Sequence, residues 1–151
     1  MIVRALIIAL SLAGLVISIY FTLAYYGRIK KARWIPEILC AREGSSCVTV
    51  VQTPYARVFG VPNSLLGIAY YIVLILWAVS GWFPSIDIQY HDTYYVLGSR
   101  TMLGPISAAT VLLGFYLIYA LRRKLHIDCP LCYTAHAINA ALLVLLVALA
   151  S

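Results

Sequence analysis

Four long apolar stretches constrain the fold of this chain more than any other feature of its sequence. Each approaches the roughly 20 residues that a helix needs to cross roughly 30 Å of hydrocarbon. Because lipid offers the backbone no hydrogen-bond partners, such stretches fold as helices. The sequence therefore predicts an all-α, multi-pass protein of the cell membrane, a single domain over residues 1–151 built as a four-transmembrane-helix bundle. The predicted helices span about Ala5–Tyr26, Ser64–Phe83, Thr101–Leu121 and Cys132–Ala150.

The composition agrees with lipid as the main solvent, since 64% of the residues are hydrophobic and only 11% are charged. The formal net charge of +6 raises the question of nucleic-acid binding. The basic residues lie in short connections beside apolar helices, however, where lipid headgroups and membrane topology account for them. We therefore expect membrane lipid, and no nucleic acid, as a partner.

The connections between the apolar stretches differ in character. In the first and longest, Val48, Val51, Tyr55 and Phe59 recur near helical spacing. This pattern predicts a helical cover segment in the loop between helices 1 and 2, lying against the bundle. The second connection, Pro84–Arg100, is polar and rich in tyrosine, and is expected to be a plain loop.

Four cysteines carry the chemistry that the sequence suggests. Cys40 and Cys47 lie in the first connection, while Cys129 and Cys132 form a CxxC motif at the start of the fourth stretch, on the same side of the membrane. A helix N-terminus lowers the pKa of a nearby thiol, which suits a redox-active pair. Because Asp128 opposes this effect at Cys129, we expect Cys132 to be the more activated thiol. A loop pair can exchange with an outside protein and then with the fixed pair.

Other interpretations of the cysteines remain open. They can form structural disulfides in a non-enzymatic membrane protein, or together bind zinc. The six residues between Cys40 and Cys47 exceed the usual spacing of zinc ligands, so no metal site is predicted. A third alternative is an analogue of DsbB-like proteins, although their CxxC motif lies in the first loop and here it begins the fourth helix.

Polar residues in the fourth stretch lie on one helical face with the CxxC motif. Cys132, His136 and Asn139 are spaced i, i+4 and i+7. Polar side chains within a membrane helix usually face a cavity or the bundle interior. His136 is therefore a candidate for lining a pocket, and Asn139 for a hydrogen bond to another helix. Asn63, at the start of the second stretch, can cap that helix.

Three stretches together resemble the vitamin K epoxide reductase family. They are SCVTV at residues 46–50, the stretch from Tyr55 to Gly67, and CPLCYTAHAIN at residues 129–139. The resemblance implies a four-helix bundle with a loop cysteine pair and a CxxC motif at the start of its last helix. It also implies a thiol:quinone oxidoreductase that supports disulfide bond formation, with a quinone of the menaquinone or ubiquinone type as the electron acceptor.

The resemblance further implies a role for each cysteine. Cys40 is expected to accept electrons from a thioredoxin-like partner, Cys47 to pass them to Cys129, and Cys132 to face the quinone. No thioredoxin-like domain follows Ser151, so the donor is expected to be a separate protein.

Two residues are implied contacts of the quinone. Asn63 matches the family asparagine that hydrogen-bonds a quinone oxygen. His136 occupies the position where vertebrate members carry a tyrosine near the quinone, and histidine can also donate a hydrogen bond.

The distribution of Lys and Arg predicts the orientation in the membrane. Nine of the eleven basic residues lie on the cysteine side: Arg28, Lys30, Lys31, Arg33, Arg42, Arg57, Arg122, Arg123 and Lys124. Since positive charge is retained on the cytoplasmic side, the cysteines are expected to face the cytoplasm. This orientation is opposite to that of bacterial and vertebrate relatives, which oxidise proteins in an export compartment.

Overall fold

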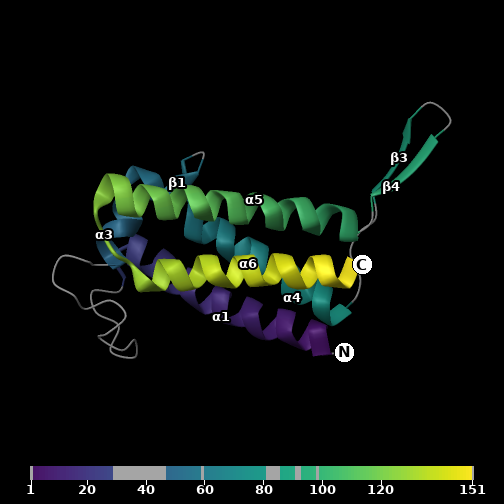
Figure 1. Cartoon of the computed structure of the whole chain (residues 1–151), viewed down its shortest axis with the longest axis horizontal. Coiled ribbons are helices and arrows are strands. Elements are labelled where there is room, and N and C mark those ends of the chain that lie inside the picture. Colours follow the sequence, from purple (N-terminus) through teal and green to yellow (C-terminus); the bar gives the residue numbers. More distant parts are fainter. Residues whose placement is uncertain are drawn as a thin grey trace.

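The computed structural model of the chain describes residues 2–28, 47–58, 60–80, 86–90, 93–97 and 99–150. Within these residues, four helices are long and apolar enough to cross a membrane. They lie side by side as a bundle with both termini at the same end, so the predicted four-helix membrane fold is confirmed (Figure 1). The helices are α1 (Ile2–Tyr25), α4 (Asn63–Ser80), α5 (Ser99–Tyr119) with a π-helical continuation η2 (Ala120–Leu125), and α6 (Pro130–Ala150).

The end of the first helix lies within one residue of the predicted end. Helix α1 ends near Tyr26 as expected, because Gly27 adopts a φ of 68°. The amide of Arg28 then bonds the carbonyl of Leu23 at 2.9 Å, and that of Gly27 bonds Ala24 at 3.1 Å, which forms a Schellman cap. The predicted end of the second helix at Phe83 lies outside the described residues.

The predicted cover segment is present, and it is shorter than the apolar spacing suggests. Helix α3 (Cys47–Gln52) is followed by a 3₁₀ turn η1 (Pro54–Ala56) and a small hairpin of β1 (Arg57–Val58) and β2 (Val61–Pro62). The helix stops because Thr53, which precedes a proline, is extended with φ −72° and ψ 154°. The segment packs on α1 at the bundle end away from the termini (Figure 1).

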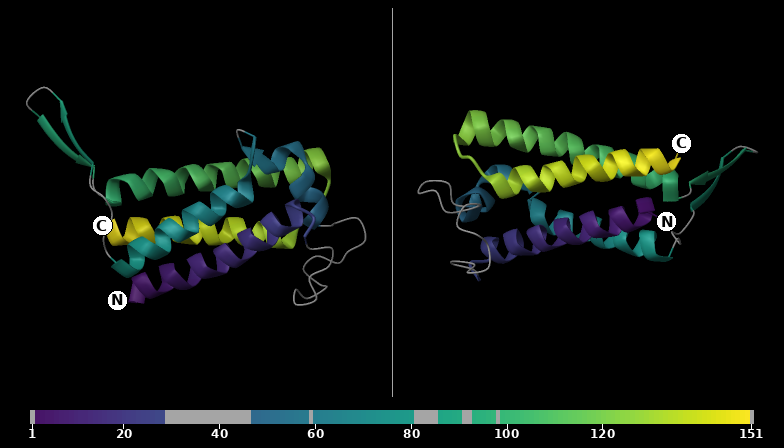
Figure 2. Two further views of the ribbon diagram at one scale, coloured as in Figure 1. Left: turned by 180° about the vertical axis from the view of Figure 1, so that it is seen from behind. Right: turned by 60° about the horizontal axis from the view of Figure 1, so that its bottom comes forward.

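The expectation of a plain loop between α4 and α5 is wrong for the residues that the structure describes. Strands β3 (Ile86–Tyr90) and β4 (Thr93–Leu97) pair antiparallel, with Ile86 opposite Leu97 and Tyr90 opposite Thr93. Isoleucine, valine, threonine and tyrosine favour strands, which accounts for a hairpin in this sequence. It projects beyond the bundle at the end that carries the termini (Figure 2).

The bundle interior combines apolar packing with interhelical hydrogen bonds. Helix α4 packs chiefly on α1 and helix α5 chiefly on α6, while backbone contacts between α4 and α5 are few among the described residues. The main buried cluster includes Ile7, Tyr71, Leu74 and Leu142. Thr22 of α1 donates to Ser64 of α4 at 2.9 Å, and hydrogen bonds of this kind hold helices together in lipid.

Candidate redox site and cavity

Cys129 and Cys132 are held together by the start of helix α6. Cys129 directly precedes the helix, whose first residue is Pro130. Its Sγ accepts a hydrogen bond from the backbone N–H of Cys132 at 3.3 Å, as the side chain of an N-cap residue does. The two side chains are buried, with exposed fractions of 0% for Cys129 and 8% for Cys132. The pair is therefore shielded from bulk water while remaining adjacent.

The hydrogen bonds at this helix start favour a thiolate at Cys129. A hydrogen bond from the Cys132 side chain, together with the backbone N–H groups of Cys132 and Leu131, lowers the pKa of Cys129 despite burial, which acts to raise it. Asp128 accepts instead from the Tyr133 hydroxyl at 3.0 Å. The expectation that Cys132 is the more activated thiol is wrong, because Cys129 occupies the position that receives these hydrogen bonds.

This arrangement predicts how Cys129 titrates in reduced protein. In a background with Cys40 and Cys47 changed to alanine, the pKa of Cys129 should be lower in Cys132→Ser than in Cys132→Ala, because only the serine hydroxyl still donates. The thiolate absorbance measured against pH gives both values. Since the fold binds the thiolate preferentially, the associated stability should be lost as pH falls through the lowered pKa. Equal midpoints in the two variants would contradict a side-chain hydrogen bond to Cys129.

Cys129 is covered from the bundle end by helix α3. Val50 and Val51 of α3 belong to the same buried cluster as Cys129, together with Tyr20 and Phe21 of α1. Cys47 is the first residue of α3, and Cys40 lies outside the described residues. The structure thus brings the helix that begins at Cys47 over Cys129, while the sulfur positions of the loop pair are not described.

A cavity of about 350 Å³ lies behind the CxxC motif, inside the bundle. Its lining is mostly apolar and comes from all four long helices and the cover segment. Three of the predicted site residues, Asn63, Cys132 and His136, line this one cavity, whereas Cys129 is not part of its lining. The Cys132 sulfur therefore faces the cavity, and the Cys129 sulfur faces the cover segment.

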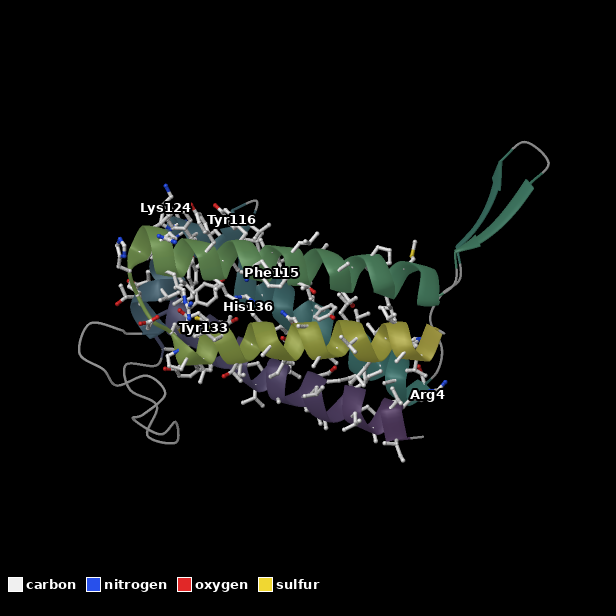
Figure 3. All side chains as sticks on the ribbon, viewed as in Figure 1. Arg4, Phe115, Tyr116, Lys124, Tyr133 and His136 are labelled. Carbon is white, nitrogen blue, oxygen red and sulfur yellow. The ribbon has the colours of Figure 1, made fainter. Side chains whose placement is uncertain are left out.

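His136 is placed at the cavity wall by a close approach between α5 and α6. Figure 3 shows it between the ribbons of these helices, one turn deeper than Tyr133. A Cβ atom on Gly114 of α5 would lie 2.8 Å from Nδ1 of His136, so the ring position depends on that glycine. Among the described residues Nδ1 has no hydrogen-bond partner although it is buried.

Two apolar residues of the cavity lining are exposed, which indicates an opening between α4 and α5. Leu66 of α4 is 41% exposed and Ile106 of α5 is 46% exposed. The two helices are joined by a hydrogen bond from the Tyr70 hydroxyl to Ser107 Oγ at 2.9 Å. An apolar molecule can thus reach the cavity sideways, without passing through water.

Asn139 makes an interhelical hydrogen bond, which was one of the roles that its sequence position left open. The Tyr71 hydroxyl of α4 donates to Asn139 Oδ1 at 2.7 Å. Asn139 also lines the cavity. Tyr71 gave no signal of its own, because tyrosines are frequent throughout this chain.

Metal binding finds no support in the part of the chain that the structure describes. No group of three or more His, Cys, Asp or Glu side chains is gathered there. A zinc site made by all four cysteines would need Cys40 and Cys47, whose side chains are not described, so that alternative is untested.

The sequence profile described as the vitamin K epoxide reductase family matches residues 5–147. No match was found among curated proteins.

Proposed function

Since the match spans nearly the whole chain, the chain belongs to the vitamin K epoxide reductase family, and we propose that it transfers electrons from protein dithiols to a quinone. Membership makes it a membrane thiol–disulfide oxidoreductase. The single observation that carries the proposal for a quinone is that Cys132 lines the same cavity as Asn63 and His136. A redox sulfur, two polar side chains and an apolar wall then converge on one space.

The cavity fits a quinone in its chemistry. Its lining is mainly apolar, as a flat hydrocarbon ring requires, and a volume of about 350 Å³ is typical of small-molecule sites. Asn63 supplies an amide donor for a carbonyl oxygen, and His136 has a buried, unpartnered ring nitrogen among the described residues. The opening beside Leu66 suits a molecule that carries an apolar tail and arrives through lipid.

The residues of this chain would then act as a relay. Cys40 takes electrons from a separate thioredoxin-like protein, and the resulting thiol of Cys47 attacks the Cys129–Cys132 disulfide at Cys129. This attack forms a Cys47–Cys129 disulfide and releases Cys132 as a thiolate. Attack by Cys40 on Cys47 then restores Cys129 as a thiol and leaves an outer disulfide, which the partner reduces in turn.

The acceptor completes the balance of the reaction. When bound, a quinone of the menaquinone or ubiquinone type takes up two electrons and two protons, which oxidises the inner dithiol to a disulfide. Cys132 provides the sulfur at the cavity, while the lowered pKa of Cys129 assists disulfide formation by supplying a thiolate. The net result is an oxidised partner, which supports disulfide bond formation in other proteins.

The quinone contacts can be tested by substitution. Asn63→Ala and His136→Ala should each raise the KM for quinone roughly 5- to 30-fold, which corresponds to losing a hydrogen bond of about 1–2 kcal/mol. Steady-state reduction with a soluble dithiol as donor measures this.

The control for these variants is Ile7→Val, which removes a buried methyl group from the bundle core, and Ile7 is not among the residues that line the cavity. Its KM should stay unchanged. If both cavity variants behave like this control, Asn63 and His136 have only structural roles.

The alternative of structural disulfides differs in a measurable way. A relay passes through a Cys47–Cys129 disulfide, which should accumulate in a Cys40→Ala variant with Cys132 as a free thiol and be detected by mass spectrometry of peptides. A structural disulfide does not exchange, so Cys129–Cys132 would then persist and Cys47 would remain a free thiol.

A further inference from the structure

Asn139 is a polar side chain that lines the cavity at a greater depth than Asn63 and Cys132. Asn63 is the first residue of α4 and Cys132 lies in the first turn of α6, so both are near the cover segment. Asn139 lies seven residues after Cys132, about 10 Å further along the helix axis. It lines the same cavity, with His136 between the two levels.

Tyr71 fixes the orientation of the Asn139 amide, and both side chains line the cavity. The Tyr71 hydroxyl donates to Asn139 Oδ1 at 2.7 Å, so the amide oxygen is directed toward α4. The amide nitrogen, which carries two N–H groups, is then turned the other way. Within the part of the chain that the structure describes, the Asn139 amide is hydrogen-bonded through Oδ1, which leaves its N–H groups available as donors at the cavity that this side chain lines.

The hydroxyl of Tyr71 has little freedom to move away. The side chain is only 2% exposed, and its ring lies directly against Gly14 of α1, where an added Cβ would overlap the ring atoms. The ring is thus held by close packing between α1 and α4. The orientation of the Asn139 amide follows from that packing.

We propose that Asn139, oriented by Tyr71, donates a hydrogen bond to the quinone oxygen that lies farther from Cys132. The inference rests on the proposed function, whose menaquinone- or ubiquinone-type acceptor is a para-quinone, and names the residue that binds its second oxygen. Because the two oxygens of a para-quinone lie on opposite edges of the ring, donors at two depths can bind both at once, whereas the adjacent oxygens of an ortho-quinone cannot be bound in this way. Asn139 is a binding residue in this arrangement, and Tyr71 is a positioning residue that acts through it.

Binding to the purified full chain tests the proposal, with decylubiquinone as the probe. Asn139→Leu preserves size and removes the donor, and should raise the Kd about 10-fold. Tyr71→Phe leaves the amide free to turn and should raise the Kd by a smaller factor. Because Tyr71 acts through Asn139, the double variant should bind no more weakly than Asn139→Leu alone.

Two further readouts separate positioning from a general loss of stability. The infrared stretch of one bound carbonyl should move toward that of the unbound quinone in Asn139→Leu and in Tyr71→Phe. Wild type should bind para-naphthoquinone more tightly than ortho-naphthoquinone, and Asn139→Leu should lose that preference. Ile7→Val, which loosens buried packing outside the cavity lining, should leave the Kd, the carbonyl stretch and the preference unchanged.

The outcomes distinguish this inference from the proposed function. If wild type binds decylubiquinone and the Asn139→Leu and Tyr71→Phe variants match Ile7→Val in every readout, the inference is wrong and the proposed function stands. If wild type binds no quinone, both fail. Should Asn139→Leu not fold, an unchanged carbonyl stretch in Tyr71→Phe by itself overturns the positioning role.

Discussion

Replacing Cys132 by serine should reduce quinone reduction to the background rate, whichever donor is used. Cys132 is the cysteine of the inner pair that lines the cavity, and Cys129 has no place in that lining. A hydroxyl cannot form the disulfide on which the two-electron step depends. The near-identical size of serine should leave the bundle folded, which a thermal unfolding curve with a midpoint close to that of wild type would verify.

The matched variant is Cys40→Ala, for which the outcome should depend on the donor. Reduction driven by dithiothreitol should continue, because a small dithiol can resolve the Cys47–Cys129 disulfide directly. Reduction driven by a thioredoxin-like protein should stop, since that protein is expected to exchange with Cys40. If Cys40→Ala is equally inactive with dithiothreitol, the proposed order of the relay is wrong.

The second prediction concerns the side of the membrane on which the cysteines lie. We propose that they face the cytoplasm. Arg57, Arg122, Arg123 and Lys124 are all exposed at the cysteine end of the bundle. Figure 3 shows Lys124 at that end and Arg4 at the opposite end. Cytoplasmic loops retain positive charge, so this distribution favours cysteines inside and termini outside.

A membrane-impermeant maleimide should therefore leave Cys40 and Cys47 unlabelled in intact cells after reduction, and should label them fully once the cells are opened. Ser80→Cys in a cysteine-free background provides the control, because Ser80 is exposed at the far end of α4 and should be labelled from outside. Labelling of Cys40 or Cys47 in intact cells would show that the predicted orientation is inverted.

The long helices could be predicted because hydrophobic length is a strong signal, whereas short elements depend on local detail. The predicted first helix ended within one residue of the observed end, because Gly27 marks that end in the sequence. The hairpin of β3 and β4 was missed because polar residues between its tyrosines suggested a loop. The helical part of the cover segment is shorter than the apolar spacing indicates, because Pro54 favours an extended conformation at the preceding Thr53.

The candidate site shows the same division between local pattern and three-dimensional contact. Spacing along α6 correctly grouped Cys132, His136 and Asn139, since helical periodicity is fixed. The prediction that Asn63 contacts a quinone rested on the family resemblance, because the periodicity of α4 does not place this residue at a cavity. The hydrogen-bond partner of Asn139 could not be predicted from the sequence. Tyr71 is one of 12 tyrosines, and the close packing of α1 against α4 brings it to Asn139.

The sideways opening beside Leu66 and Ile106 determines which pool of molecules the enzyme samples. A substrate that arrives between α4 and α5 diffuses in two dimensions, and its concentration is set by partitioning into the bilayer. Turnover should then follow the mole fraction of quinone among the lipids, and diluting vesicles in buffer should leave it unchanged. In the proposed reaction the bilayer would act as the reservoir for the electron acceptor, while the aqueous phase would supply the protein dithiols.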